Sequence, residues 1–170
     1  MPQKKRDFAN NTLQQLNREA YLTHCHWMAK AIVLGQTAGN LGEVPVGAVI
    51  VDRQGDLLAA AANRKYRENN PTAHAEILAI QTATRKIKSS YLTDCTLYVT
   101  LEPCPMCAGA VIHARLNLLV YGADDPKTGA IRSIVNLPDS ECSNHHLQVL
   151  PGIQETACRQ QLQNWFERRR

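Results

Sequence analysis

The sequence contains no apolar run long enough to span a membrane, and its first residues lack the apolar centre of a secretory signal. A membrane span needs about 18 or more consecutive apolar residues, and a signal peptide carries an apolar segment after its basic start. Internal repeats and long linkers are also absent from the sequence. We therefore expect a cytoplasmic, single-domain protein without membrane contact.

The length and composition are those of a folded globular domain. The chain has 170 residues, of which 44% are hydrophobic and 20% charged, close to the averages of globular proteins. A domain most often has about 100 to 150 residues, so one core is expected. The polar, aperiodic residues 1–15 are predicted to form a flexible N-terminal arm, and residues 16–170 a single domain.

The positive charge lies at the two ends of the chain. Residues 1–20 carry four bases and two acids, and residues 159–170 carry four bases and one acid, so 21–158 hold the remaining eleven bases and twelve acids. Basic ends on a neutral body fit contacts to nucleic acid, and they also fit solubilising tails. The charge pattern alone leaves both interpretations open.

Hydrophobic periodicity predicts strands that alternate with helices. The expected elements are a helix over 16–34 that Gly35, Gly39 and Gly42 end, a β-hairpin over 46–51 and 57–62, a helix over 74–87 with Thr72 as its N-cap, a strand over 96–101, a helix over 104–114, strands over 118–121 and 147–150, and a helix over 154–168. This order predicts an α/β fold in which helices cover both faces of a mixed sheet of about five strands.

Two short motifs at predicted helix starts carry the chemistry. His74 begins one helix, and Cys104 and Cys107 begin another. Two cysteines three residues apart share one face of a helical turn, so both sulfur atoms can reach one ion. A catalytic zinc site takes three protein ligands and leaves the fourth position to water. We predict one Zn²⁺ per chain, held by His74, Cys104 and Cys107.

Glu76 follows His74 by two residues and is the predicted proton carrier. Zinc lowers the pKa of its bound water to about 7, which makes hydroxide available, and a nearby carboxylate can move the protons. An acid at a helix start is also explained by the helix dipole. Beside His74 and the paired cysteines, proton transfer is the better interpretation of Glu76.

These motifs resemble the signature of zinc-dependent nucleobase deaminases. The flanking text resembles bacterial tRNA-specific adenosine deaminases in Asn63 and in the segments EVPVGAV (43–49), PTAHAE (71–76), LYVTLEPC (97–104), MCAGA (106–110) and KTG (127–129). The resemblance implies a cytidine-deaminase-like three-layer α/β/α fold, a homodimer and a tRNA anticodon stem-loop as partner.

The same resemblance assigns further residues to substrate binding. Asn63 would hydrogen-bond the flipped base, and the Ala75 backbone would line the same pocket. Family positions near the anticodon nucleotides correspond here to Asp125, Lys127 and Asn144. A C-terminal helix that helps to hold the RNA in the family corresponds to the segment with Phe166 and the terminal arginines.

The sequence departs from the family at a few places. Asp124 stands where some bacterial members carry a basic residue, and the N-terminal arm and the segment from Gln36 to Gly42 are longer than in compact members. Two other groups are poor candidates for metal sites, since neither is held on one face of a regular element: His24, Cys25, His26, and Cys142, His145, His146.

The expected function is hydrolytic deamination of adenosine to inosine at the wobble position of a tRNA anticodon, with zinc-activated hydroxide and Glu76 as proton shuttle. One alternative is a free nucleobase or nucleoside deaminase that acts on cytosine, guanine or adenine. The non-enzyme alternative is a zinc-stabilised RNA-binding module.

Overall fold

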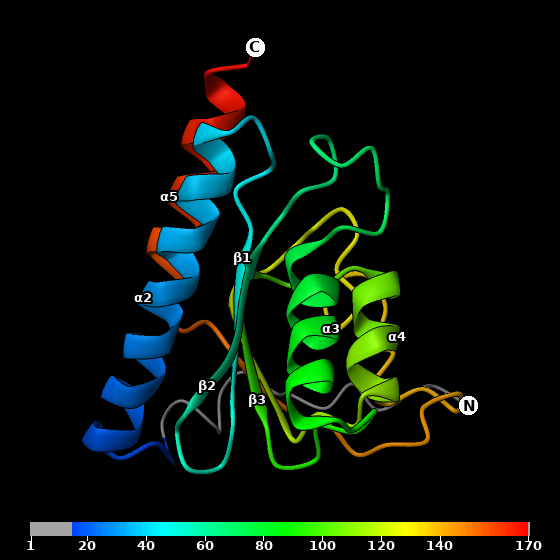
Figure 1. Cartoon of the computed structure of the whole chain (residues 1–170). Helices are drawn as coiled ribbons and strands as arrows, with labels where there is room; N and C mark the ends of the chain where they lie inside the picture. Colours follow the sequence, from blue (N-terminus) through cyan, green and yellow to red (C-terminus); the bar gives the residue numbers. More distant parts are fainter. Residues whose placement is uncertain (1–14, 170) are drawn as a thin grey trace.

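The computed structural model describes residues 15–169, which contain four helices and five strands (Figure 1). Nearly all of the predicted N-terminal arm therefore lies outside the described residues, as does Arg170. The elements are α2 (Arg18–Asn40), β1 (Gly47–Val51), β2 (Leu57–Ala62), α3 (Ala75–Ile87), β3 (Thr96–Leu101), α4 (Pro105–His113), β4 (Leu118–Ala123), β5 (Gln148–Pro151) and α5 (Glu155–Glu167).

The five strands form one mixed sheet in the order β2-β1-β3-β4-β5. Strand β1 is antiparallel to β2 and to β3, with Val49 opposite Ala60 on one side and Tyr98 on the other. Strands β3, β4 and β5 are parallel. The mixed sheet of about five strands that the sequence predicts is confirmed.

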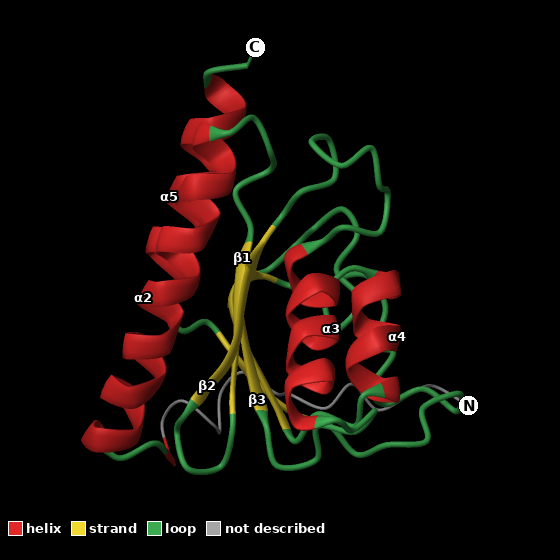
Figure 2. Cartoon of the chain, viewed as in Figure 1, coloured by secondary structure: helices red, strands yellow, loops and turns green. Residues whose placement is uncertain are grey.

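Helices cover both faces of this sheet, with α2 and α5 on one side and α3 and α4 on the other (Figure 2). Successive residues of a strand point to opposite faces, and β1 shows it. Ala48 and Ile50 pack in the core under α3 and α4, whereas Val49 and Val51 pack in the core under α2 and α5. A strand buried on both faces is apolar throughout, and the three-layer α/β/α architecture is confirmed.

Helix α2 is longer than predicted, because two glycines inside it serve packing rather than termination. The helix continues through Gly35 and Gly39 to Asn40. A Cβ on Gly35 would lie 2.9 Å from the carbonyl oxygen of Pro45, and one on Gly47 would lie 2.0 Å from that of Ala31. The prediction that Gly35 ends the helix was wrong. Gly35 in the helix and Gly47 in the strand instead let α2 lie directly against the start of β1.

The start of α3 also differs from the prediction. His74, with φ −77° and ψ 151°, is the N-cap, and Ala75 is the first helical residue. Thr72 is not the cap, because its amide N–H and its hydroxyl donate to Oδ1 of Asn70 at 2.9 and 2.7 Å. The Ala75 N–H instead donates to Oδ1 of Asn63 at 2.9 Å, which satisfies a free amide at the helix start.

The carboxyl ends of β3 and β4 meet at one edge of the sheet, where Leu101 pairs with Ala123. Just beyond this edge lie Cys104, the N-cap of α4, and Asp125, which follows the end of β4. Ligands of open α/β sheets bind at the carboxyl ends of parallel strands, so this edge is where a site is expected. None of the described helices is long and apolar enough to cross a membrane.

Candidate active site

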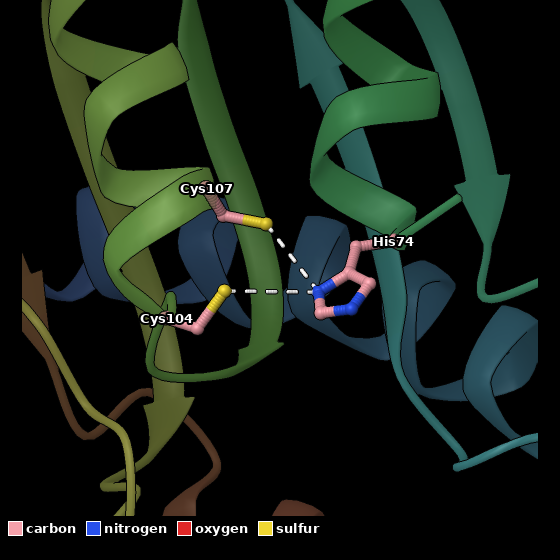
Figure 3. Close-up of side chains that lie close together, drawn as sticks. All are labelled: His74, Cys104 and Cys107. Atoms are coloured by element: carbon pink, nitrogen blue, oxygen red, sulfur yellow. Dashed lines mark hydrogen bonds between the residues drawn. The ribbon is translucent and has the colours of Figure 1, made fainter. Parts of the chain in front are cut away.

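His74, Cys104 and Cys107 converge at this edge, as the sequence predicts. Nδ1 of His74 lies 3.8 Å from Sγ of Cys104 and 3.6 Å from Sγ of Cys107. Figure 3 shows the imidazole turned toward both sulfur atoms, across the gap between α3 and α4. All three ligand atoms lie within 4.8 Å of one another. Across residues 15–169, no other group of His, Cys, Asp or Glu brings three ligand atoms together in this way.

Local backbone structure aims these side chains. His74 and Cys104 are both N-caps in extended conformation, so each side chain stands at the end of a helix rather than on its flank. Pro105 occupies the first turn of α4, where its missing N–H costs nothing and its fixed φ suits the helix. Cys107 lies within that first turn and is fully buried.

The charge arrangement of the three residues suits a soft divalent cation. The Cys107 thiol and the His74 ring stabilise the Cys104 thiolate and lower the pKa of Cys104 to about 4. The pKa of Cys107 is raised, because this thiol lies beside Cys104 and is buried. A cation between the sulfurs would favour both thiolates at once. Two thiolates and an imidazole are ligands that zinc prefers, so the residues fit a zinc ion.

Glu76 lies in the same first turn of α3 and is 4% exposed. Burial raises the pKa of this carboxyl group above its ordinary value, and the His74 ring lowers it in part. A carboxyl group with raised proton affinity can hold a proton and release it within one reaction. Burial beside the ligand group argues against a mere helix-start acid, which would have no reason to leave solvent.

A cavity of about 190 Å³ opens over these residues. Sites for drug-sized ligands are larger, about 300–1,000 Å³, so this cavity suits one small ring system. Its lining combines carboxylates, a basic residue and apolar side chains: Glu43, Val44, Val46, Asn63, Lys65, Tyr66, His74, Glu76, Leu101, Glu102, Cys104, Asp125 and Thr128.

Asn63 lines this cavity with its amide already oriented. Its Nδ2 donates to the carbonyl oxygen of Val44 at 3.2 Å, and its Oδ1 accepts from the N–H of Ala75 at 2.9 Å. One amide hydrogen and one oxygen lone pair remain for a further partner. Ala75 is fully buried, and its N–H is engaged by Asn63, so Ala75 supports the wall of the site behind Asn63.

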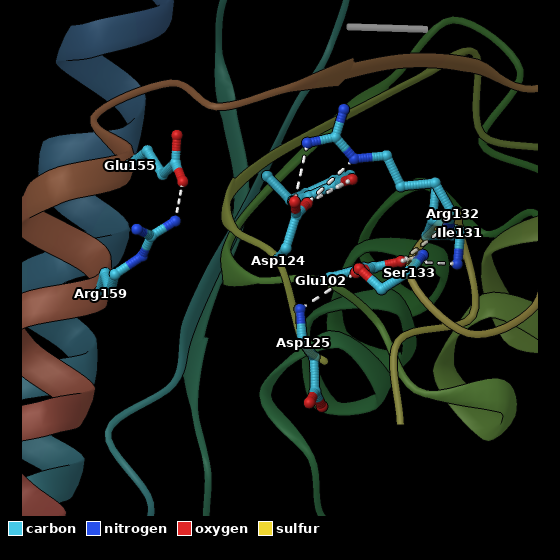
Figure 4. Close-up of polar contacts among 9 residues, drawn as sticks. Glu102, Asp124, Asp125, Ile131, Arg132, Ser133, Glu155 and Arg159 are labelled. Carbon is cyan, nitrogen blue, oxygen red and sulfur yellow. Dashed lines mark hydrogen bonds and ion pairs between the residues drawn. The ribbon is translucent and has the colours of Figure 1, made fainter. Parts of the chain in front are cut away.

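The buried carboxylate of Glu102 holds the loop that forms another wall (Figure 4). Oε1 accepts from the N–H groups of Ile131, Arg132 and Ser133 at 3.0, 2.8 and 3.0 Å. Oε2 accepts from the N–H of Asp125 at 3.0 Å and from the Ser133 hydroxyl. One side chain therefore fixes both ends of the segment from Asp125 to Ser133.

Asp125, Lys127 and Phe166 lie on this side of the cavity. Oδ1 of Asp125 accepts from the N–H of Lys127 at 2.9 Å, so Asp125 shapes a turn as well as lining the site. Nζ of Lys127 lies 5.9 Å from the ring centroid of Phe166 on α5. Phe166 is 46% exposed. An exposed aromatic ring and a base thus come together from distant parts of the sequence.

Asn144 is not brought to this group. It is exposed and precedes β5, whose first residue Gln148 pairs with Leu118 at the start of β4. Its neighbour His145 contacts the carbonyl oxygen of Leu116, with Nε2 at 2.6 Å. Because β4 and β5 are parallel, Asn144 lies at the amino end of these strands, opposite the cavity.

Asp124, where a basic residue stands in some family members, is neutralised within the chain. Nε and a terminal nitrogen of Arg132 donate to its two carboxylate oxygens at 3.0 and 2.9 Å, and the Tyr121 hydroxyl donates to Oδ1 at 3.1 Å. The two side chains form an ion pair without net charge, so Asp124 supplies no free negative charge at a position where some family members carry a basic residue.

Sequence reasoning assigned no role to Glu43, Lys65 or Tyr66, all of which line the cavity. Lys65 and Tyr66 stand in the run Arg64-Lys65-Tyr66-Arg67, and this mixture of bases with an aromatic residue was a detectable signal of nucleic-acid contact. Glu43 lies in the family-like segment EVPVGAV (43–49), but this segment alone does not indicate what its carboxylate contacts.

The chain belongs to a deaminase family, because residues 22–170 match the MafB19-like deaminase family. A tRNA-specific adenosine deaminase of Haemophilus influenzae is 45% identical over 143 residues, which cover 84% of this chain and 83% of the relative. The chain belongs to the family of tRNA-specific adenosine deaminases.

Solved structures agree with this membership. One from work on A-to-I editing by tRNA:A34 deaminases at the wobble position of transfer RNA has a TM-score of 0.78 at 42% identity, covering 81% of this chain and 99% of that one. A guanine deaminase from Nitrosomonas europaea is more distant, with a TM-score of 0.71 at 26% identity and coverage of 83% of each chain.

Proposed function

We propose that this protein hydrolytically deaminates adenosine to inosine at the wobble position of a tRNA anticodon. The chemistry rests on one observation, the buried Glu76 beside the His74, Cys104 and Cys107 group at the floor of a small cavity. The substrate rests on the relatives, since tRNA-specific adenosine deaminases match most of the chain at high identity.

We further propose one zinc ion per chain, with His74, Cys104 and Cys107 as its protein ligands. When bound to three protein ligands, zinc activates water for attack near neutral pH. The remaining chemistry belongs to the chain, which must place the base, exclude bulk water and move protons.

Glu76 is the group that moves protons. Deamination replaces the amino group at C6 of adenine with oxygen from water and releases ammonia. The carboxylate of Glu76 takes a proton from the attacking water and passes it to the ring nitrogen or to the leaving amine, so it ends the cycle as it began. Its raised pKa suits this exchange, because burial favours the protonated form that must donate.

Asn63 is proposed to read the flipped base. Its amide is held by the Val44 carbonyl and the Ala75 N–H, so the remaining donor and acceptor are pre-oriented toward the cavity. A fixed donor and acceptor pair selects among bases by leaving a buried polar group unpaired when the wrong base enters. Ala75 contributes from behind this wall of the pocket, because its N–H fixes the side-chain oxygen of Asn63.

We propose that the anticodon nucleotides contact Asp125 at the wall of the cavity, and Lys127 and Phe166 beyond it. The exposed ring of Phe166 offers a stacking surface, and Lys127 brings positive charge to it. The proposed contact of Asn144 with RNA would lie away from this cavity, given its position at the amino end of β5. A homodimer in the cytoplasm, where tRNA is processed, completes the proposal.

A free-base deaminase is the second candidate, and the likeness to the Nitrosomonas europaea guanine deaminase is the observation in its favour. A zinc-stabilised RNA-binding module without activity is less well supported, since such a module has no use for the buried Glu76.

Substrate comparison separates these candidates. Zinc-loaded protein is incubated with an anticodon stem-loop that carries adenosine at the wobble position, and with free adenosine, adenine, guanine and cytosine, while ammonia release and inosine are measured. The proposal expects kcat/KM to be far higher for the stem-loop than for any free compound. Faster turnover of free guanine would favour the second candidate, and no turnover of any substrate would favour the binding module.

A further inference from the structure

The loop between β2 and α3 carries three basic side chains and a tyrosine at the mouth of the cavity. Arg64, Lys65, Tyr66 and Arg67 follow directly after Asn63, and all four are exposed. Lys65 and Tyr66 also line the cavity, and Tyr66 is 57% exposed. An aromatic side chain of this size left in solvent, at the entrance to a site, has a surface available for a partner.

Glu43 holds this loop in place from beneath. The carboxylate is fully buried, and its two oxygens accept from the N–H of Tyr66 at 3.2 Å and the N–H of Arg67 at 2.8 Å. The loop also folds back on itself, with the N–H of Asn70 donating to the carbonyl oxygen of Lys65 at 3.0 Å. The ring of Tyr66 is thus presented by an ordered backbone, which reduces the entropy cost of binding.

The charge and ring of this loop suit single-stranded RNA. Nζ of Lys65 lies 5.5 Å from the ring centroid of Tyr66, and the segment from Arg64 to Glu68 carries three bases against one acid. Single strands are bound by basic surfaces with aromatic rings on which bases stack. The cavity of about 190 Å³ takes one base, so the neighbouring nucleotides must remain at its mouth.

Resting on the proposed function, we propose that the Tyr66 ring stacks on the base of a nucleotide directly adjacent to the target adenosine. The loop stands at the same end of the molecule as the C-terminal end of α5, which carries Phe166 (Figure 1). The basic side chains around Tyr66 attract the phosphates of the RNA backbone. Tyr66 holds the strand beside the cavity while Asn63 reads the flipped nucleobase.

The test compares Tyr66→Ala, Tyr66→Phe and a matched control, Tyr91→Ala. Tyr91 is 52% exposed and also lies beside a cation, with the Arg115 guanidinium carbon 4.9 Å from its ring centroid, but it follows the C-terminal end of α3, far along that helix from the cavity. Kd is measured for zinc-loaded protein with an anticodon stem-loop, and with stem-loops that lack the base on the 5′ or the 3′ side of the wobble adenosine. KM and kcat are measured on the complete stem-loop.

Loss of a stacked base weakens single-strand binding by about 1–3 kcal/mol, or roughly 5- to 150-fold. We expect Tyr66→Ala to raise Kd and KM by such a factor with kcat little changed, and Tyr66→Phe and Tyr91→Ala to bind as the parent does. One of the two RNAs with a missing base should bind the parent more weakly by the same factor and show no further loss with Tyr66→Ala.

Three results would overturn the stacking proposal. These are unchanged binding by Tyr66→Ala, an equal loss with Tyr66→Phe, and losses that simply add for both RNAs with a missing base. Because these comparisons of protein variants and RNAs measure binding, their outcome does not depend on turnover. A parent that makes no inosine on the complete stem-loop would instead count against the proposed function.

Discussion

Glu102 offers the sharpest test of how the site is held together. The change Glu102→Gln keeps the shape of the side chain but replaces one acceptor oxygen with an NH₂ group. The new amide can be placed in two orientations. In the more stable one, its oxygen faces the N–H groups of Ile131, Arg132 and Ser133, and its NH₂ group faces the N–H of Asp125. That arrangement opposes two donors inside a buried region.

The cost of this change follows from the contacts. A buried donor without a partner costs about 1–3 kcal/mol, and the three remaining bonds lose their charge, which weakens each of them. We therefore expect Glu102→Gln to lower the free energy of unfolding by about 2–4 kcal/mol. The segment that carries Asp125 should also loosen, so KM for the stem-loop should rise while one metal ion per chain is retained.

Urea denaturation of zinc-loaded protein, at one protein concentration, measures this loss. Glu155→Gln is the matched control, since the Glu155 side chain is 44% exposed and pairs with Arg159 one helical turn away, a contact worth about 0.3–0.5 kcal/mol. If Glu102→Gln unfolds within about 0.5 kcal/mol of the parent, the carboxylate does not anchor the loop and the reasoning fails.

The remaining predictions concern the metal, the base-reading amide and a half-buried histidine. Cys104→Ser should lose bound zinc by metal analysis, whereas Cys142→Ser, at an exposed cysteine, should keep one zinc per chain; full occupancy in Cys104→Ser would contradict the ligand set. Asn63→Ala should reduce kcat/KM on the stem-loop and leave zinc content unchanged, because it removes the amide from the cavity and the partner of the Ala75 N–H; unchanged kinetics would exclude a role in reading the base. Burial lowers the pKa of His24, whose Nδ1 lies 2.9 Å from the Tyr98 hydroxyl. The folded state therefore binds fewer protons than the unfolded state, and the unfolding free energy should fall from pH 7.5 to pH 5.5. This fall should be larger in the parent than in His24→Gln. Equal dependence of the unfolding free energy on pH in the two proteins would refute the prediction.

The three residues of the metal group could be predicted because the sequence patterns that indicate them are local. His74, Cys104 and Cys107 lie at helix starts that are visible from spacing alone, and the structure brings all three together. The sheet was predictable for the same reason, since a short, mainly apolar run marks each strand. The layering of helices followed from the order of elements.

Features set by contacts between distant segments were not predictable. Gly35 reads as a helix end, yet it is required by the approach of Pro45 and β1. Asn144 was grouped with residues near the cavity, but the register of β5 against Leu118 sets it at the other end of the sheet. The anchoring role of Glu102 depends on amides about 30 residues later in the chain, and no local pattern reveals such a contact.

The rate of inosine formation by zinc-loaded parent and Glu76→Gln, on a stem-loop with adenosine at the wobble position, tests the central claim most directly. The account predicts one inosine and one ammonia per adenosine from the parent. For Glu76→Gln it predicts equal zinc content, similar RNA affinity and a rate lower by about 10⁴, the upper range for loss of general acid–base catalysis. A Glu76→Gln rate within tenfold of the parent, or a parent with one zinc per chain that forms no inosine, would contradict it.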